Sequence, residues 1–136
     1  YETTITECFD MYCDKHNKPS LKLHFNADEN IGVSKNIIMS FISPLLENAV
    51  TASPDNKEIR LSVSRQDEWT NITIENECAT TPKISDLKTL GYSSKEGHIG
   101  TGLNTVRHFL VLLGGKELQI STDKNNIKFK INIPVK

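Results

Sequence analysis

Apolar and polar residues along this chain follow two spacings, one typical of helices and one typical of strands. Over residues 3–14 apolar side chains recur every three or four positions, which predicts a helix. In Leu21–Phe25 apolar and polar residues alternate, which predicts a half-buried strand. The helical spacing then returns, and we expect a long helix that is capped by Ser34 and ends near Ala52.

The long helix carries one apolar stripe and one proline. The stripe consists of Ile38, Phe41, Ile42, Leu45, Leu46 and Ala49. Pro44 lies inside this stretch, where a proline removes one backbone hydrogen bond and costs about 3 kcal/mol. We therefore expect either a kink at this point or a new helical segment with Pro44 in its first turn.

The middle of the chain begins with two strand patterns and then loses its periodicity. Alternating residues predict strands over 59–64 and 69–74, joined by a short hairpin connection at 65–68. Residues 75–102 show neither spacing, so we expect a long loop with one helical turn near 84–90. A loop of that length in a compact domain often has a functional role.

The chain closes with a helix and a pair of strands. Helical spacing returns over 103–113 and stops at Gly114, and alternation predicts strands over 118–120 and 127–133. Because hairpins dominate this order of elements, we predict the α/β (α+β) class. The expected architecture is a two-layer α/β sandwich with a mixed, mostly antiparallel sheet and helices on one face.

Composition restricts the classes of function. The chain has 136 residues, 37% of them hydrophobic and 24% charged, which fits one globular domain with one core. Its net charge of -1 provides no strong field toward nucleic acid or an anionic membrane. No apolar run reaches the roughly 18 residues of a membrane-spanning helix. We therefore expect no nucleic-acid binding and no direct membrane insertion of this segment.

Two further features bear on where the chain works. Its three cysteines, Cys8, Cys13 and Cys78, lack metal-binding spacing, so we interpret them as free thiols in a reducing compartment. The chain starts at Tyr1 and not at a methionine. We therefore expect residues 1–136 to be a single domain taken from a longer protein.

A polar, glycine-rich segment leads into the last predicted helix. Gly97, Gly100 and Gly102 fall within six residues, and Lys95 precedes them. Glycine lets a backbone approach an anion closely, and a helix start supplies unpaired N–H groups and a positive dipole end. The segment therefore indicates a phosphate site, and an ordinary surface loop is the alternative. It is not a Walker A loop, because no lysine follows the last glycine.

Two asparagines stand beside apolar patterns. Asn48 lies at the edge of the apolar stripe, where a buried amide costs stability unless it is hydrogen-bonded. Its carbonyl oxygen is also a suitable hard ligand for Mg²⁺. Asn76 follows a strand, where its side chain can reach a ligand at the sheet edge. The alternatives are a surface asparagine bonded to nearby backbone at 48 and a simple turn at 76.

Four segments in this order resemble the catalytic ATP-binding domain of sensor histidine kinases. They are Glu47-Asn48-Ala49, Ile74-Glu75-Asn76, the glycine box Gly97–Leu103 and Leu113-Gly114-Gly115. This is the GHKL class, which is shared with gyrase, a heat-shock chaperone family and MutL. The resemblance spans about Leu21 to Pro134 and implies the Bergerat sandwich, with ATP between a lid and the long helix.

The resemblance also implies roles for individual residues. Asn48 would coordinate the Mg²⁺ that bridges the nucleotide phosphates, and Asn76 would recognise adenine. Glu47 would accept a proton from the attacking imidazole. The expected lid and phosphate contacts are Tyr92, Lys95, Gly97, Gly100, Thr101, Gly102 and Leu103.

The chain shares details with two groups of kinases and departs from the class at one motif. The run Pro44–Ala49 is similar to that of LytS-like kinases, and residues 91–103 are similar to the lid and glycine box of AgrC-like kinases. Where the class usually has Asp-x-Gly-x-Gly, this chain has Asn76, Cys78 and Thr80. An asparagine still offers a carbonyl oxygen to adenine, but losing a charged acceptor weakens that bond by about 1 kcal/mol.

The implied reaction is transfer of the γ-phosphoryl group of ATP to a histidine on a dimerisation hairpin, with a response regulator downstream. His16, His24, His98 and His108 lack the context of that phosphoacceptor, so we expect this domain to be inactive alone. The expected location is the cytoplasmic portion of a membrane-bound sensor. One alternative is a pseudokinase or docking module with weak or no ATP binding. Another is a GHKL serine kinase of the anti-sigma-factor type.

Overall fold

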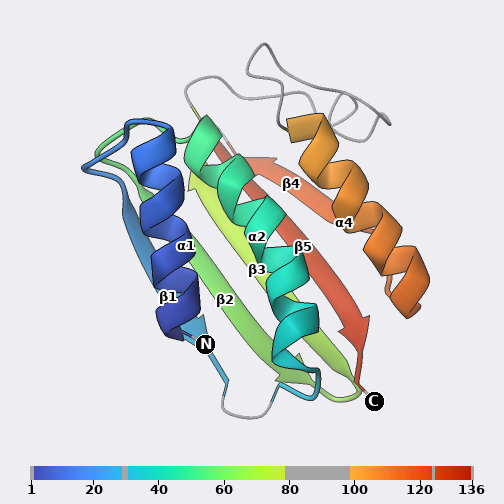
Figure 1. Cartoon of the computed structure of the whole chain (residues 1–136). Coiled ribbons are helices and arrows are strands. Elements are labelled where there is room, and N and C mark those ends of the chain that lie inside the picture. The colour runs from blue at the N-terminus through green and yellow to red at the C-terminus, as the bar shows by residue number, and fades with distance from the viewer. Residues whose placement is uncertain (1, 29–30, 79–98, 124, 136) are drawn as a thin grey trace.

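Helices cover one face of a five-stranded sheet (Figure 1). The computed structural model describes residues 2–28, 31–78, 99–123 and 125–135. The helices there are α1 (Glu2–Lys15), α2 (Lys35–Ala52) and α4 (Ile99–Leu113), and the strands are β1 (Lys22–Ala27), β2 (Glu58–Gln66), β3 (Trp69–Glu77), β4 (Gln119–Asp123) and β5 (Asn126–Pro134). The predicted two-layer sandwich with helices on one face is confirmed.

The sheet is mixed and mostly antiparallel, as the hairpin-rich order predicts. Its strand order is β1-β2-β3-β5-β4, and only β1 and β2 pair in parallel. Strands β2 and β3 are longer than predicted, so that Gln66 pairs with Trp69 and the turn contains two residues instead of four. Asp67 in that turn has a positive φ of 56°, which aspartate tolerates better than most side chains.

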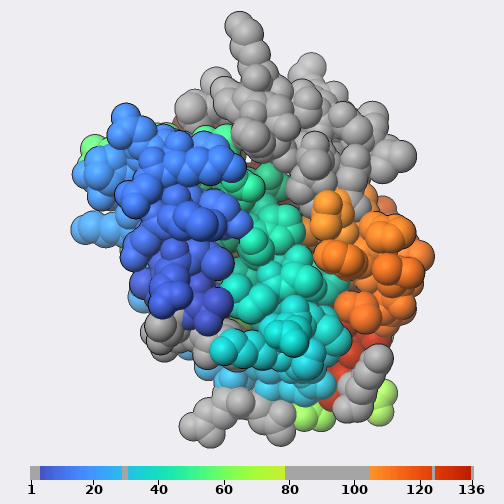
Figure 2. Space-filling view, viewed as in Figure 1, coloured from blue at the N-terminus to red at the C-terminus, as the bar shows by residue number. Residues whose placement is uncertain are grey.

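The core lies between the sheet and the helices. Helix α2 lies between α1 and α4 (Figure 2), and it crosses the middle of the sheet (Figure 1). The predicted apolar stripe of α2 is buried throughout, and each of its six side chains is at most 2% exposed. Phe41 of this stripe meets Phe109 of α4 edge-on, with the ring centroids 6.0 Å apart. The stripe therefore packs against both the sheet and α4.

Pro44 lies inside one continuous helix, so of the two alternatives the new helical segment is wrong. The buried residues Phe41, Ile42, Leu45 and Leu46 flank it on both sides. Burial of that apolar surface offsets the hydrogen bond that the proline removes. The start of α2 is as predicted, because Ser34 Oγ accepts a hydrogen bond from Ile37 N at 3.3 Å.

The C-terminal end of α2 is held by a lysine from the α1–β1 connection. Lys18 Nζ donates to Val50 O at 2.6 Å and to Thr51 O at 2.8 Å, and it also contacts Ser53 O. A cation here satisfies carbonyl groups that have no partner within the helix and complements the negative dipole end. The last turns of α2 are therefore fixed in place.

Candidate functional site

Three of the predicted site segments lie at one end of the domain. The C-terminal ends of α2 and β3 and the start of α4 all lie at the upper end in Figure 1. Asn48 is in the last part of α2, Asn76 is one residue before the end of β3, and Gly100 follows the first residue of α4. The structure therefore brings these segments to the same edge of the sandwich.

Asn48 is a buried residue with an unused hydrogen-bonding atom. Its side chain is on the core side of α2 and the residue is 4% exposed. The nitrogen Nδ2 is fully buried, and no residue in the described ranges accepts its hydrogens. Leaving a buried donor unpaired costs about 1–3 kcal/mol. Asn48 is thus not a surface asparagine, and its amide has capacity for an external partner.

Asn76 is buried as deeply but has partners for its nitrogen. It follows Ile72 and Ile74 at alternate positions of β3, so it faces the helix layer, and it is 2% exposed. Its Nδ2 donates to Glu77 O at 3.2 Å and to Cys78 Sγ at 3.6 Å. No described residue donates to its oxygen Oδ1. The side chain therefore offers an acceptor.

Cys78 directly follows β3 and contacts the side chain of Asn76. Its backbone N donates to Asn125 O at 2.7 Å, which continues the strand pairing toward the turn before β5. Burial raises the pKa of the Cys78 thiol, although the hydrogen bond from Asn76 opposes this. The thiol therefore stays neutral near pH 7.

Helix α4 begins earlier than the sequence pattern predicts. It starts at Ile99, so the residues from Gly100 to Leu103 form its first turn instead of a preceding loop. The first backbone N–H groups of a helix have no acceptor within it, and they lie at the positive end of its dipole. No acidic residue occupies this first turn. The other predicted contacts, Tyr92, Lys95 and Gly97, lie outside the described residues, as does the helical turn predicted near 84–90.

Comparison with known families identifies the family of this chain. The profile described as GHKL domain matches residues 35–135. The chain belongs to the GHKL family. A comparison with curated proteins found no match.

Solved structures of histidine kinases have the same fold as this GHKL domain. The catalytic domain of histidine kinase ThkA is 19% identical with a TM-score of 0.76, and the match covers 98% of this chain and 93% of that one. Histidine kinase AdeS of Acinetobacter baumannii is 19% identical with a TM-score of 0.74, covering 98% and 62%. A mycobacterial sensor histidine kinase, MprB, is 15% identical with a TM-score of 0.69, covering 96% and 93%.

Glu47 of the GHKL domain forms an ion pair at the end of α1. Its Oε2 lies 2.8 Å from Lys15 Nζ and 3.5 Å from His16 Nε2. Partial burial alone would raise the pKa of Glu47, but the hydrogen bonds from Lys15 and His16 outweigh it and hold the pKa below its usual value. The carboxylate is therefore ionised at neutral pH and has a low affinity for a proton.

The cluster of basic residues from α1 and the connection after it was not predicted from the sequence. Lys15, His16 and Lys18 meet the end of α2 more than 30 positions away along the chain. No local motif signals such a contact, because it depends on how α1 packs on α2. Thr51 forms a hydrogen bond within α2, because its Oγ1 donates to Glu47 O at 2.9 Å.

Two structural features are absent from the described residues. No group of three or more His, Cys, Asp or Glu side chains is placed to hold a metal ion there. A metal at this end of the domain would therefore rely on ligands such as the Asn48 amide together with groups of the nucleotide. Among the described helices, none has the length and apolar character needed to cross a membrane.

Proposed function

We propose that this GHKL domain binds ATP and Mg²⁺ at the end of α2 and β3 and acts as the catalytic domain of a sensor histidine kinase. The observation that carries this proposal is the pair of buried asparagines at one end of the sandwich. Among the described residues, Asn48 Nδ2 has no hydrogen-bond partner and Asn76 Oδ1 has no donor. Buried amides keep such free atoms at a cost, which a ligand can offset.

Asn76 is proposed to recognise adenine. Because its nitrogen is used by Glu77 O and Cys78 Sγ, the amide orientation is fixed with the oxygen as the free atom. An exocyclic amino group, as in adenine, donates to such an oxygen, whereas the carbonyl of guanine would face it with an acceptor. We therefore expect preference for ATP over GTP.

Asn48 and the start of α4 are proposed to serve the phosphate end. The two atoms of an amide have nearly the same shape, so Asn48 can donate to a phosphate oxygen or, with its amide rotated, offer its oxygen to Mg²⁺. When bound, Mg²⁺ would neutralise phosphate charge. The first N–H groups of α4 would bind phosphate oxygens, and Tyr92, Lys95 and Gly97 would add the remaining contacts from the lid.

The reaction is proposed to be transfer of the γ-phosphoryl group to a histidine on a separate dimerisation hairpin. A bond forms between phosphorus and the imidazole nitrogen, the bond to the β-phosphate oxygen breaks, and ADP leaves. The imidazole proton would pass to Glu47, which must first loosen its pair with Lys15. A response regulator would receive the phosphoryl group, and the domain would work on the cytoplasmic side of a membrane-bound sensor of the AgrC-like or LytS-like kind.

A pseudokinase of the same fold is the second candidate. It is favoured by the adenine end, where Asn76 replaces an acidic residue and a buried Cys78 follows in place of a glycine. A cysteine side chain leaves less room for close backbone approach than a glycine does. Both candidates share the fold and differ in nucleotide affinity.

Calorimetric titration of the chain with a non-hydrolysable ATP analogue in the presence of Mg²⁺ distinguishes the two candidates. The kinase proposal predicts saturable binding that weakens when Mg²⁺ is removed, and weaker binding of the matching GTP analogue. No binding at millimolar nucleotide would contradict it and favour the pseudokinase.

A further inference from the structure

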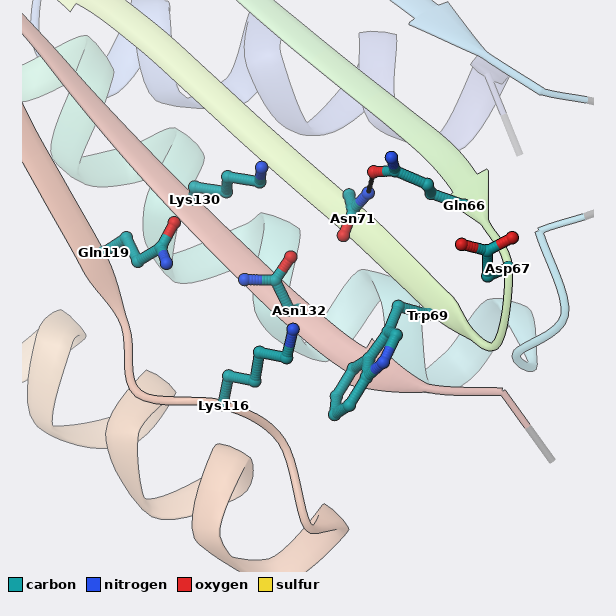
Figure 3. A pocket seen from close by; sticks show the side chains of 8 residues that line it. All are labelled: Gln66, Asp67, Trp69, Asn71, Lys116, Gln119, Lys130 and Asn132. Carbon is teal, nitrogen blue, oxygen red and sulfur yellow. Dashed lines mark hydrogen bonds between the residues drawn. The ribbon is translucent and has the colours of Figure 1, made fainter.

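The face of the sheet that carries no helix contains a groove. It lies between the β2–β3 turn and the connection from α4 to β4, and it has a volume of about 400 Å³ (Figure 3). Its lining residues include Asp67, Trp69, Asn71, Lys116, Lys130 and Asn132. Asn71 and Asn132 alternate with the inward-facing Ile72 and Ile131, so they point away from the helices. The groove is therefore separate from the end of the domain proposed for ATP.

Two asparagines form the floor of this groove. Asn71 and Asn132 are direct partners across β3 and β5, and they are 8% and 6% exposed. Asn71 Nδ2 donates to Gln66 Oε1 at 3.3 Å. Within the described part of the chain, no residue bonds to Asn71 Oδ1 or to either amide atom of Asn132. These amide atoms face the open groove and not the core, so a ligand on the groove floor can bond to them.

One end of the groove is cationic. Lys116 Nζ lies 4.4 Å from the centre of the Trp69 ring, a cation–π geometry, and Lys116 N donates to Asn132 O at 3.1 Å. Lys130 precedes Asn132 by two positions and lies on the same face of β5. Neither lysine forms an ion pair with a described carboxylate. In Figure 3 the Asn132 amide lies between the two ammonium groups, so this part of the groove offers an anion two cations and an amide.

The opposite end of the groove carries hydrogen-bond acceptors. Asp67 lies in the β2–β3 turn, across the groove from both lysines, and its carboxylate has no ion-pair partner among the described residues (Figure 3). Asn71 Oδ1 on the floor adds a neutral acceptor. A long acidic chain crossing the groove would meet Asp67 unfavourably, whereas a compact ligand can match both ends.

We propose that this groove binds a small carboxylate that also carries a hydroxyl or amino group. Its carboxylate lies against Lys116, Lys130 and Asn132, its donor faces Asp67 and Asn71, and its carbon skeleton rests beside Trp69. The volume of about 400 Å³ falls within the range of small-molecule sites. The proposal does not depend on nucleotide binding by the domain.

The test uses Trp69, which is the single tryptophan of the chain, as a fluorescent reporter. The protein is titrated to 20 mM with L-malate, L-glutamate, succinate and inorganic phosphate at constant ionic strength. We expect a saturable change in emission with malate or glutamate, and several-fold weaker binding of succinate, which lacks the donor. No saturable change with malate and glutamate would overturn the proposal, and so would tighter binding of phosphate than of both.

Two lysine variants sharpen this test. Lys130→Met removes one cation of the groove and is expected to weaken binding about tenfold or more. Lys128→Met changes a lysine on the same strand and face that does not line the groove, and it should leave affinity unchanged. An equal loss in both variants would show a general charge effect and contradict the site. Melting temperatures of both variants confirm that each is folded.

Discussion

The two buried asparagines at the proposed nucleotide site differ in how their amides are used. Asn76 is 2% exposed and its nitrogen has two partners, Glu77 O and Cys78 Sγ. Asn48 is 4% exposed and its nitrogen has none among the described residues. The fold therefore explains the nitrogen of Asn76 but leaves that of Asn48 without a structural reason.

The stability of the fold accounts for an asparagine at position 76 but not for one at position 48. An apolar side chain of similar size would serve the core better at position 48, because it would remove an unpaired buried donor. At position 76 the amide nitrogen supports the end of β3 whether or not a ligand is bound. The two residues should thus respond in opposite ways to substitution.

The largest effect is expected for Asn48→Leu. We expect Mg²⁺-dependent nucleotide binding to fall more than about 100-fold, while the free energy of unfolding stays level or rises by about 1 kcal/mol. Calorimetry measures the first quantity and urea denaturation the second. Asn36→Leu, at an exposed position in the first turn of α2, is the matched control and should change neither by much. A destabilised variant with normal affinity would assign Asn48 a purely structural role.

Asn76→Asp should have the next largest effect, and it acts on stability. The substitution replaces a donor 3.2 Å from Glu77 O with an acceptor, so we expect the unfolding free energy to fall by about 2 kcal/mol at pH 7. Asn26→Asp, on β1 with no side-chain bond to lose among the described residues, provides the control in the same denaturation experiment. If the two variants are equally stable, the Asn76 nitrogen does not support the strand end.

Lys18→Met tests the support of the α2 end. Three carbonyl groups would lose a charged donor, so we expect a loss of about 1–2 kcal/mol in unfolding free energy. Lys35→Met removes an exposed lysine at the other end of α2 and should have little effect. Unchanged stability in the Lys18 variant would mean that water replaces the lysine at these carbonyls.

The smallest effect concerns Glu47 and pH. Its pKa is lowered in the folded state, so its pair with Lys15 and His16 stabilises the protein above the ordinary glutamate value of about 4.5. This contribution is lost as the pH falls through the lower folded value. The stability difference between wild type and Glu47→Gln should therefore be present at pH 6 and shrink toward pH 3. A difference that does not change with pH would contradict the ion pair.

The sequence predicted the elements that depend on local spacing and missed those that depend on packing. The apolar stripe of α2 and its cap at Ser34 follow from residues close together in the chain, and both are confirmed. The two outcomes at Pro44 could not be separated, because the choice depends on how much apolar surface the whole helix buries. The spacing predicts the start of α4 at residue 103, later than the observed Ile99, because a glycine-rich stretch has a low helix propensity.

The candidate site was predictable in part for the same reason. The motifs around Asn48 and Asn76 are visible in the sequence, but the unpaired nitrogen at 48 depends on which groups α2 meets in the fold. The ion pair of Glu47 with Lys15 joins residues 32 positions apart and leaves no local signal. Likewise, the alternating pattern of β3 and β5 places Asn71 and Asn132 on the open face of the sheet, but it does not predict that they are buried there.

The most direct test of the proposed site is an NMR titration that follows the side-chain NH₂ signals of Asn48 and Asn76 separately. We predict that adenosine shifts the signals of Asn76 without Mg²⁺, because Asn76 recognises the base. The signals of Asn48 should shift only with a non-hydrolysable ATP analogue and Mg²⁺. If the nucleotide binds and neither pair of signals moves, the nucleotide site lies elsewhere and the account of both asparagines is wrong.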